Sequence, residues 1–186
     1  MLGLLVSLQS SFLSACARAT YETPDYKVVT MEKPFEIRDY PALTIVTAPM
    51  PHRGNDGAFM KLFRFISGKN DRSEKIAMTT PVLMTGTESG SMSFIVPKAV
   101  ATEGAPSPSN PELSLSTKPA ARYAVIRFSG STSPKLAEEK AAKLADWVTA
   151  KGLHPESTPL FAYYNPPWTP GFMRRNEVLI RIHPDE

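Results

Sequence analysis

The two halves of the chain show the same order of predicted elements, and this repeat limits the folds that the chain can adopt. In each half, two stretches of alternating apolar and polar residues precede a helical stretch, and two more follow it. The predicted strands are 35–40, 42–50, 75–85 and 91–97 in the first half and 112–117, 122–130, 159–165 and 177–183 in the second, with helices at 57–67 and 134–151. A polar connector rich in Pro and Ser, Thr102–Pro111, separates the halves.

The repeat predicts the α+β class, with two β-α-β-β repeats of approximately 27–100 and 112–186. We expect their antiparallel strands to join in one distorted β-barrel with two flanking helices. The 18 prolines favour turns and bent edge strands, and therefore a β-rich fold. The net charge is only +3 and no basic run is present, so nucleic-acid binding has little electrostatic support and we expect no nucleic-acid partner.

The first fifteen residues are predicted to be a signal peptide of the lipoprotein type. Residues 2–13 are largely apolar but too few to span a bilayer as a helix. They lead to Leu13-Ser14-Ala15-Cys16, the pattern at which bacterial lipoprotein precursors are cut and acylated. We expect lipidation at Cys16, a tether over 16–26 and a domain over 27–186, anchored by its lipid in the cell envelope and facing the periplasm.

Two features bear on this prediction. No Lys or Arg lies near Met1, which is unusual for a signal peptide, and the alternative is that Cys16 is a buried apolar thiol. Ala17 stands where an acidic residue would retain a lipoprotein at the inner membrane, which favours the outer membrane where the cell has one.

The two predicted helices differ in pattern. Helix 134–151 is an ordinary amphipathic helix: Ser133 caps it, Gly152 ends it, and a stripe at helical spacing faces the core, namely Ala137, Ala141, Leu144 and Val148. Helix 57–67 is apolar around more of its circumference than one core-facing stripe requires. Phe59, Leu62 and Ile66 suffice for the core, which leaves Met60 and Phe63 at one edge with Arg64 beside them.

An apolar edge next to a fixed cation suits a flat apolar ligand with an acidic rim, such as a tetrapyrrole with propionates. The alternative is that a neighbouring loop covers this edge. The loop Asn165–Arg175 can do so, because Pro stiffens it and Trp168, Phe172 and Met173 give it more apolar surface than an exposed loop normally carries. We expect Arg175 to form an internal ion pair with Glu177 or another acid, while the role of Arg174 stays open.

Four segments resemble the signatures of the SOUL, or haem-binding-protein, family, in the same order and spacing: KIAMTTPV (75–82), SMSFIVP (91–97), RYAVIRFSG (122–130) and YNPPWTPGFMRRNEVLI (164–180). The resemblance runs from about Tyr26 to the C-terminus. It implies a distorted barrel of two β-α-β-β halves, also similar to effector-binding domains of bacterial transcription regulators. It further implies reversible binding of haem or another porphyrin in a shallow groove beside the first helix, near the loop before the last strand.

The resemblance implies the ligand-contacting residues by position. On the helix these are Phe63 and Arg64, with Met60 on the same edge, and on the loop they are Phe172, Met173 and Arg174. His52 precedes the first helix and is either an axial ligand of the haem iron or a surface residue, and Met60 is a weaker candidate ligand. The segment KIAMTTPV receives a structural role, at a bend of the sheet.

Other chemistry has little support in the sequence. The three histidines form no paired metal-ligand spacing, and no nucleophile elbow or phosphate-binding glycine loop is present. The acids Glu36 and Asp39 flank Arg38 and are explained by solvated ion pairs. We therefore predict a tetrapyrrole-binding protein that is not an enzyme and that buffers, carries or senses its ligand at the envelope. The alternatives are a haem-degrading enzyme or ester hydrolase of the same fold, and a structural envelope lipoprotein without a small-molecule ligand.

Overall fold

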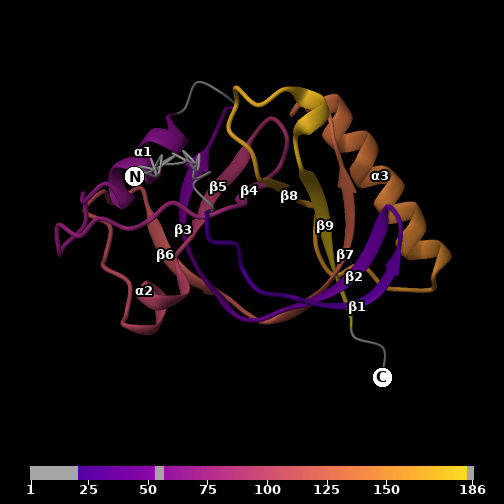
Figure 1. The fold of residues 1–186 in the computed structure, drawn as a ribbon, viewed down its shortest axis with the longest axis horizontal. Coiled ribbons are helices and arrows are strands. Elements are labelled where there is room, and N and C mark those ends of the chain that lie inside the picture. Colours follow the sequence, from indigo (N-terminus) through magenta and orange to yellow (C-terminus); the bar gives the residue numbers. More distant parts are fainter. Residues whose placement is uncertain (1–20, 53–56, 184–186) are drawn as a thin grey trace, which may run out of the picture.

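One antiparallel sheet organises the molecule (Figure 1). The computed structural model describes residues 21–52 and 57–183. The strands are β1 (Lys27–Glu32), β2 (Phe35–Tyr40), β3 (Leu43–Met50), β4 (Val82–Thr85), β5 (Gly90–Ile95), β6 (Ser114–Lys118), β7 (Ala121–Phe128), β8 (Leu160–Tyr163) and β9 (Asn176–Ile182). The helices are α1 (Ala58–Ile66), α2 (Lys98–Thr102) and α3 (Pro134–Ala150), with a single 3₁₀ turn, η1 (Gly171–Met173).

The strand order β1-β2-β7-β9-β8-β4-β5-β3-β6 confirms the predicted repeat. β7, β9 and β8 in the second half pair as β3, β5 and β4 do in the first, and β8 pairs with β4 where the halves meet. One strand of each half pairs with the other half: β2 of the first half pairs with β7, and β6 of the second half pairs with β3. Neither half therefore completes its own part of the sheet.

The sheet curves strongly but does not close into a barrel, because its end strands β1 and β6 do not pair with each other. Three elements differ from the prediction. The strand expected over 75–85 begins only at Val82, after Pro81, which has no N–H to donate to a sheet. Strand β1 and the short helix α2 were not predicted, since neither has a clear apolar period.

The helices α1 and α3 cover one face of the sheet. On β9, Val178, Ile180 and Ile182 point to that face and pack in the main core, whereas Leu179 points to the opposite face. A second apolar cluster forms on that opposite face. This alternation follows from the period of two in a strand, so each face of the sheet supports a different site.

Helix α3 has the predicted ends and core face. The Ser133 side chain accepts a hydrogen bond from the Leu136 N–H, and Gly152 adopts a positive φ of 72° after the last turn. All four residues of the predicted stripe are buried. Among the described residues, no helix is both long and apolar enough to cross a membrane. Cys16 and the predicted signal peptide lie outside the described residues.

Candidate functional site

Helix α1 exposes a row of large apolar side chains, which we call the α1 strip: Phe59, Met60 and Phe63. Their exposed fractions are 44%, 49% and 44%. The rings of Phe59 and Phe63 lie nearly parallel, with centroids 6.2 Å apart. Residues four apart are neighbours on a helix surface, so these side chains form one continuous apolar surface.

The core face of α1 differs from the prediction in one residue. Leu62 and Ile66 are buried as expected, but Phe65 takes the third place and Phe59 does not. Leu62, Phe65 and Ile66 are three and four residues apart, so they form the stripe that faces the sheet. Phe59 lies at the edge of that stripe and contacts the ring of Phe94 edge-on at 5.4 Å.

Arg64 supplies a cation next to the α1 strip. It is exposed and follows Phe63 directly, one turn after Met60. Among the residues that the structure describes, no carboxylate lies within ion-pair distance of Arg64, whereas Lys61 on the same helix pairs with Glu112 at 3.2 Å. The positive charge beside the apolar surface is therefore available to an anionic group of a ligand.

His52 is exposed and lies two residues after the end of β3, just before the segment 53–56, which the structure does not describe. The proposed axial ligation of haem iron by His52 stays a prediction. In the described ranges, no group of three or more His, Cys, Asp or Glu side chains is placed to hold a metal ion.

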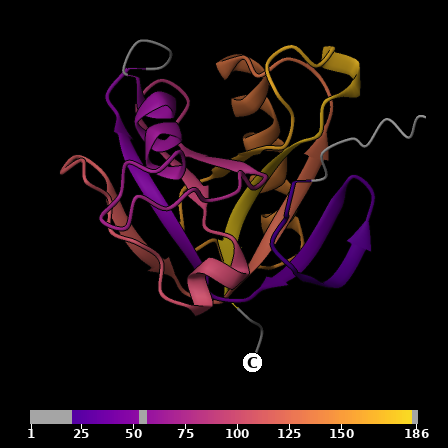
Figure 2. The same cartoon turned by 60° about the vertical axis from the view of Figure 1, so that its left-hand side comes forward.

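The second part of the predicted site, the loop before β9, lies away from α1. Figures 1 and 2 both show η1 next to α3, with α1 at the other side of the molecule. Phe172 and Met173 are exposed there, at 80% and 56%. Arg174 donates a hydrogen bond from Nε to the Thr169 carbonyl at 2.7 Å and another from Nη2 to the Pro167 carbonyl. Arg174 therefore holds the loop together, and the structure does not bring Phe172, Met173 or Arg174 into contact with the α1 strip.

The opposite face of the sheet contains a buried ion pair that the sequence analysis missed. Arg38 was expected in solvated pairs, but its side chain is 1% exposed and that of Glu177 is fully buried. The Arg38 guanidinium donates to both Glu177 carboxylate oxygens at 2.8 and 3.1 Å, and to Glu36 at 2.7 Å. The prediction was wrong because β2 is an inner strand, paired with both β1 and β7, and the Tyr26 ring covers the Arg38 guanidinium on this face. The remaining acid, Asp39, forms a partly exposed pair with Arg122 at 2.7 Å.

Further groups surround Glu177. Arg175 donates to it at 2.8 Å, which confirms the predicted internal ion pair, and the Tyr164 hydroxyl donates to it at 2.9 Å. Burial alone raises the pKa of Glu177, but the hydrogen bonds and charges of Arg38 and Arg175 outweigh it, so the pKa lies below its usual value. Burial raises the pKa of Tyr40, which contacts Arg38, to about 12. The carboxylate of Glu177 is thus charged, buried and already paired.

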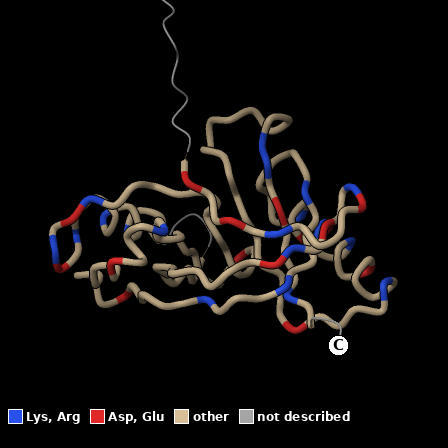
Figure 3. The backbone as a smooth tube through the Cα atoms, turned by 60° about the horizontal axis from the view of Figure 1, so that its bottom comes forward, with Lys and Arg blue, Asp and Glu red and all other residues tan. Residues whose placement is uncertain are grey.

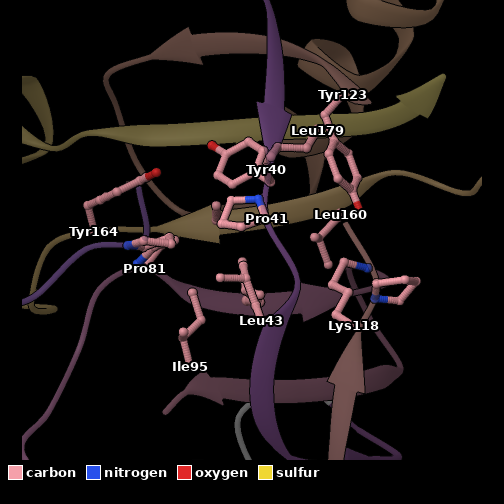
Figure 4. Close-up of a pocket in the computed structure, with 14 residues that line it drawn as sticks. Tyr40, Pro41, Leu43, Pro81, Ile95, Lys118, Tyr123, Leu160, Tyr164 and Leu179 are labelled. Atoms are coloured by element: carbon pink, nitrogen blue, oxygen red, sulfur yellow. The ribbon is translucent and has the colours of Figure 1, made fainter. Parts of the chain in front are cut away.

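A small apolar hollow lies beside this network (Figure 4). Its volume is about 30 Å³, room for a water molecule or two and far below that of a tetrapyrrole site. Its walls are apolar side chains and tyrosines from both halves: Tyr40, Leu43, Leu83, Ile95, Tyr123, Leu160, Tyr164 and Leu179. These side chains close against one another across the sheet, which explains the small volume.

Residues 21–26, the described part of the predicted tether, lie across this same face. The Glu22 carbonyl accepts a hydrogen bond from the Thr80 N–H at 2.9 Å, and its carboxylate accepts one from the Lys98 N–H at 2.8 Å. The Tyr26 ring covers the Arg38 guanidinium at 4.3 Å. A groove of about 330 Å³ remains between this segment and α2, with the acids Glu22 and Asp25 in its wall.

The two faces therefore offer different chemistry. Along the tube in Figure 3, Lys and Arg are interspersed with Asp and Glu, and no long run of one sign is visible. On the helix-covered face, the α1 strip combines open apolar surface with the cation of Arg64. On the opposite face, the charges are already paired and the apolar hollow is nearly filled. Alternation along β2 and β9 places Arg38 and Glu177 on one face, but the pairing of these strands with β7 could not be read from either segment alone.

Comparison with protein families gives one match that covers most of the chain. The family described as "SOUL heme-binding protein" matches residues 21–181. None of the curated proteins matches the sequence significantly.

Solved structures show the same fold at low sequence identity. The C-terminal domain of EcmrR superposes with a TM-score of 0.60 at 11% identity, covering 85% of this chain and 98% of that domain. A hydrolase from Listeria innocua gives 0.58 at 8% identity, covering 83% of this chain and 94% of the other. An uncharacterized conserved protein from Listeria innocua gives 0.58 at 8% identity, covering 89% and 94%. At these identities, the similarity establishes the fold and no activity.

Proposed function

The chain belongs to the SOUL haem-binding protein family, and on this premise we propose that it binds haem or a related tetrapyrrole reversibly on the α1 strip. The observation that carries the proposal is the row Phe59, Met60 and Phe63, half-exposed beside Arg64, which has no carboxylate within ion-pair distance in the described part of the chain. Soluble domains normally turn such a helix face inward or make it polar, so an exposed one indicates a binding surface.

The residues present fit the ligand. The parallel rings of Phe59 and Phe63 offer a flat apolar surface to the macrocycle, and Met60 extends it. Arg64 suits a propionate, because a guanidinium pairs with a carboxylate through two hydrogen bonds. Haem, when bound, would supply its iron chemistry, and His52 is the proposed axial ligand. Fully burying such side chains contributes about 1.5–3 kcal/mol each, and a half-open surface realises only part of this, so we expect moderate affinity.

Reversible binding of moderate affinity suits a protein that buffers, carries or senses its ligand. We propose that it does so at the cell envelope, held by a lipid on Cys16. The low-identity similarity to a hydrolase does not favour an enzyme over a binding protein, since the fold hosts both.

The test is a haem titration of the full chain, followed by the Soret band. Phe63→Asp places a charge in the middle of the α1 strip and is expected to abolish saturable binding while the fold is retained. Val29→Asp is the matched control, because Val29 is similarly exposed, at 43%, on β1. Unchanged binding by a folded Phe63→Asp variant would refute the proposed site.

Two further variants refine the site. Phe172→Asp tests the loop, and loss of binding there would show that the ligand extends from α1 to η1, as the family resemblance implies. His52→Ala tests ligation. An altered Soret position with retained binding identifies His52 as the iron ligand, whereas an unchanged spectrum removes it from the site.

A further inference from the structure

The loop Asn165–Arg174, which we call the aromatic loop, carries the two most exposed large apolar side chains of the described residues. Trp168 is 82% exposed and Phe172 is 80% exposed, with Met173 beside them at 56%. The loop projects at the rim of the molecule, next to the start of α3 (Figure 2). Exposing a Trp and a Phe together in water is unfavourable, so this surface is expected to have a partner.

The aromatic loop is held in one shape by its own hydrogen bonds. The Thr169 N–H donates to the Pro166 carbonyl at 3.0 Å, and the Met173 N–H donates to the Pro170 carbonyl at 2.9 Å. The guanidinium of Arg174 donates to two further loop carbonyls. Backbone groups that are paired within the loop do not depend on water, so these groups keep their hydrogen bonds when the tip leaves water.

The aromatic loop itself carries charge of one sign. No Asp or Glu occurs between Tyr164 and Asn176, and the neighbouring turn 129–134 has no charged residue. This turn contacts the loop through a hydrogen bond from the Gly130 N–H to the Gly171 carbonyl at 2.9 Å. Among the described residues, no carboxylate lies within ion-pair distance of Arg174, so its positive charge is not neutralised by an acid.

We propose that the aromatic loop inserts into the interfacial region of a phospholipid bilayer. Trp, with an apolar ring and one N–H, favours the headgroup level, and Phe and Met favour the acyl chains just below it. The positive charge of Arg174 suits anionic headgroups. A projecting, rigid tip fits a fluid surface, whereas a protein partner would need a matching cavity. This inference does not rest on the proposed haem site, which lies on α1.

The experiment uses the full chain, without haem, on vesicles of equal parts phosphatidylcholine and phosphatidylglycerol. The emission spectrum of Trp168 is obtained by subtracting the spectrum of Trp168→Phe from that of the wild type, which removes the contribution of Trp147. We expect a blue shift on vesicles and quenching by brominated acyl chains. The readout reports the depth of one residue in the bilayer, so the test stays valid whether or not the N-terminus is also attached to the bilayer.

Two variants give the test its controls. Phe172→Ser with Met173→Ser is expected to reduce the inserted fraction of Trp168 about tenfold, since each lost apolar side chain removes part of its burial energy. Val29→Trp in a Trp168→Phe background is the matched control, and we expect the indole at position 29 to remain in water. Emission of Trp168 that stays water-like on vesicles, or equal quenching at position 29, would overturn the proposal. The proposal would also be overturned if a protein partner shielded Trp168 from water and vesicles did not.

Discussion

Helices α1 and α3 occupy equivalent places in the two halves, yet the side chains that they expose to water differ in chemistry. Each covers the same face of the sheet and buries four residues. Helix α3, with 17 residues, exposes mainly charged and small side chains, whereas α1, with nine, exposes Phe59, Met60 and Phe63. Since α3 packs without such a surface, the fold does not require the α1 strip.

The halves also differ on the other face of the sheet. The buried pair of Arg38 and Glu177 joins β2 to β9, next to β7 in the second half. Strands β3, β4 and β5 of the first half present no buried ion pair among the described residues, and Leu83 and Ile95 contribute apolar contacts there. The buried ion pair therefore joins the two halves through β2 and β9, and the part of the sheet formed by β3, β4 and β5 lacks an equivalent among the described residues.

The largest expected effect comes from breaking the buried ion pair. Glu177→Ala leaves Arg38 charged, buried and without its main partner, and such a change costs about 3–5 kcal/mol of unfolding free energy. Urea denaturation measures it. Asp39→Ala is the control, since Asp39 forms a partly exposed pair whose loss costs about 0.2–1 kcal/mol. Equal losses in both variants would contradict the special role of Glu177.

The second largest loss of stability is expected from the core-facing side of α3. Leu144 is fully buried, so Leu144→Ala creates a cavity and is expected to cost about 2–5 kcal/mol of unfolding free energy. Haem affinity, measured under conditions in which the variant is folded, should stay unchanged because the substitution does not alter α1. A large loss of haem affinity in the folded fraction of this variant would show that haem binding on α1 depends on the core of α3.

Acid should remove a part of the stability that Glu177 provides. Its pKa in the folded protein lies below that of the unfolded chain, so its contribution is complete above the ordinary pKa of Glu and is lost as the pH falls through the lowered folded value. Urea denaturation midpoints, measured between pH 6 and pH 3 in steps of about one pH unit, give this loss of stability. Glu177→Gln should show a shallower fall than the wild type, and parallel curves would contradict the assignment.

The smallest effect on stability is expected on the α1 strip. Met60→Lys with Phe63→Glu gives α1 an exposed face like that of α3, and exposed substitutions usually change the unfolding free energy by less than about 0.5 kcal/mol. Haem binding should nevertheless be lost. Thermal denaturation and titration of the same sample give both values. A strongly destabilised variant would mean that the α1 strip belongs to the core.

Local patterns in the sequence predicted the repeat, both long helices and most of the strands, because the periods of 2 and 3.6 record which side chains face a core. They also predicted that Met60 and Phe63 lie outside the core-facing stripe of α1, since a short helix that carries so much apolar surface cannot bury all of it. Local patterns placed Phe59 in the core instead of Phe65, because Phe59 lies near the middle of the apolar arc of the helix and Phe65 at one edge of it. Packing against the sheet decides the outcome: Phe65 is buried, and Phe59 contacts Phe94 edge-on.

The tertiary structure decided which distant residues meet. Arg38 and Glu177 are 139 positions apart, and they pair because β2 and β9 lie on either side of β7. The separation of α1 from the aromatic loop has the same origin, since strand order places η1 next to α3. A sequence records the environment of each residue through its period and polarity, but contacts between segments depend on the closure of long chain loops, which no local pattern encodes.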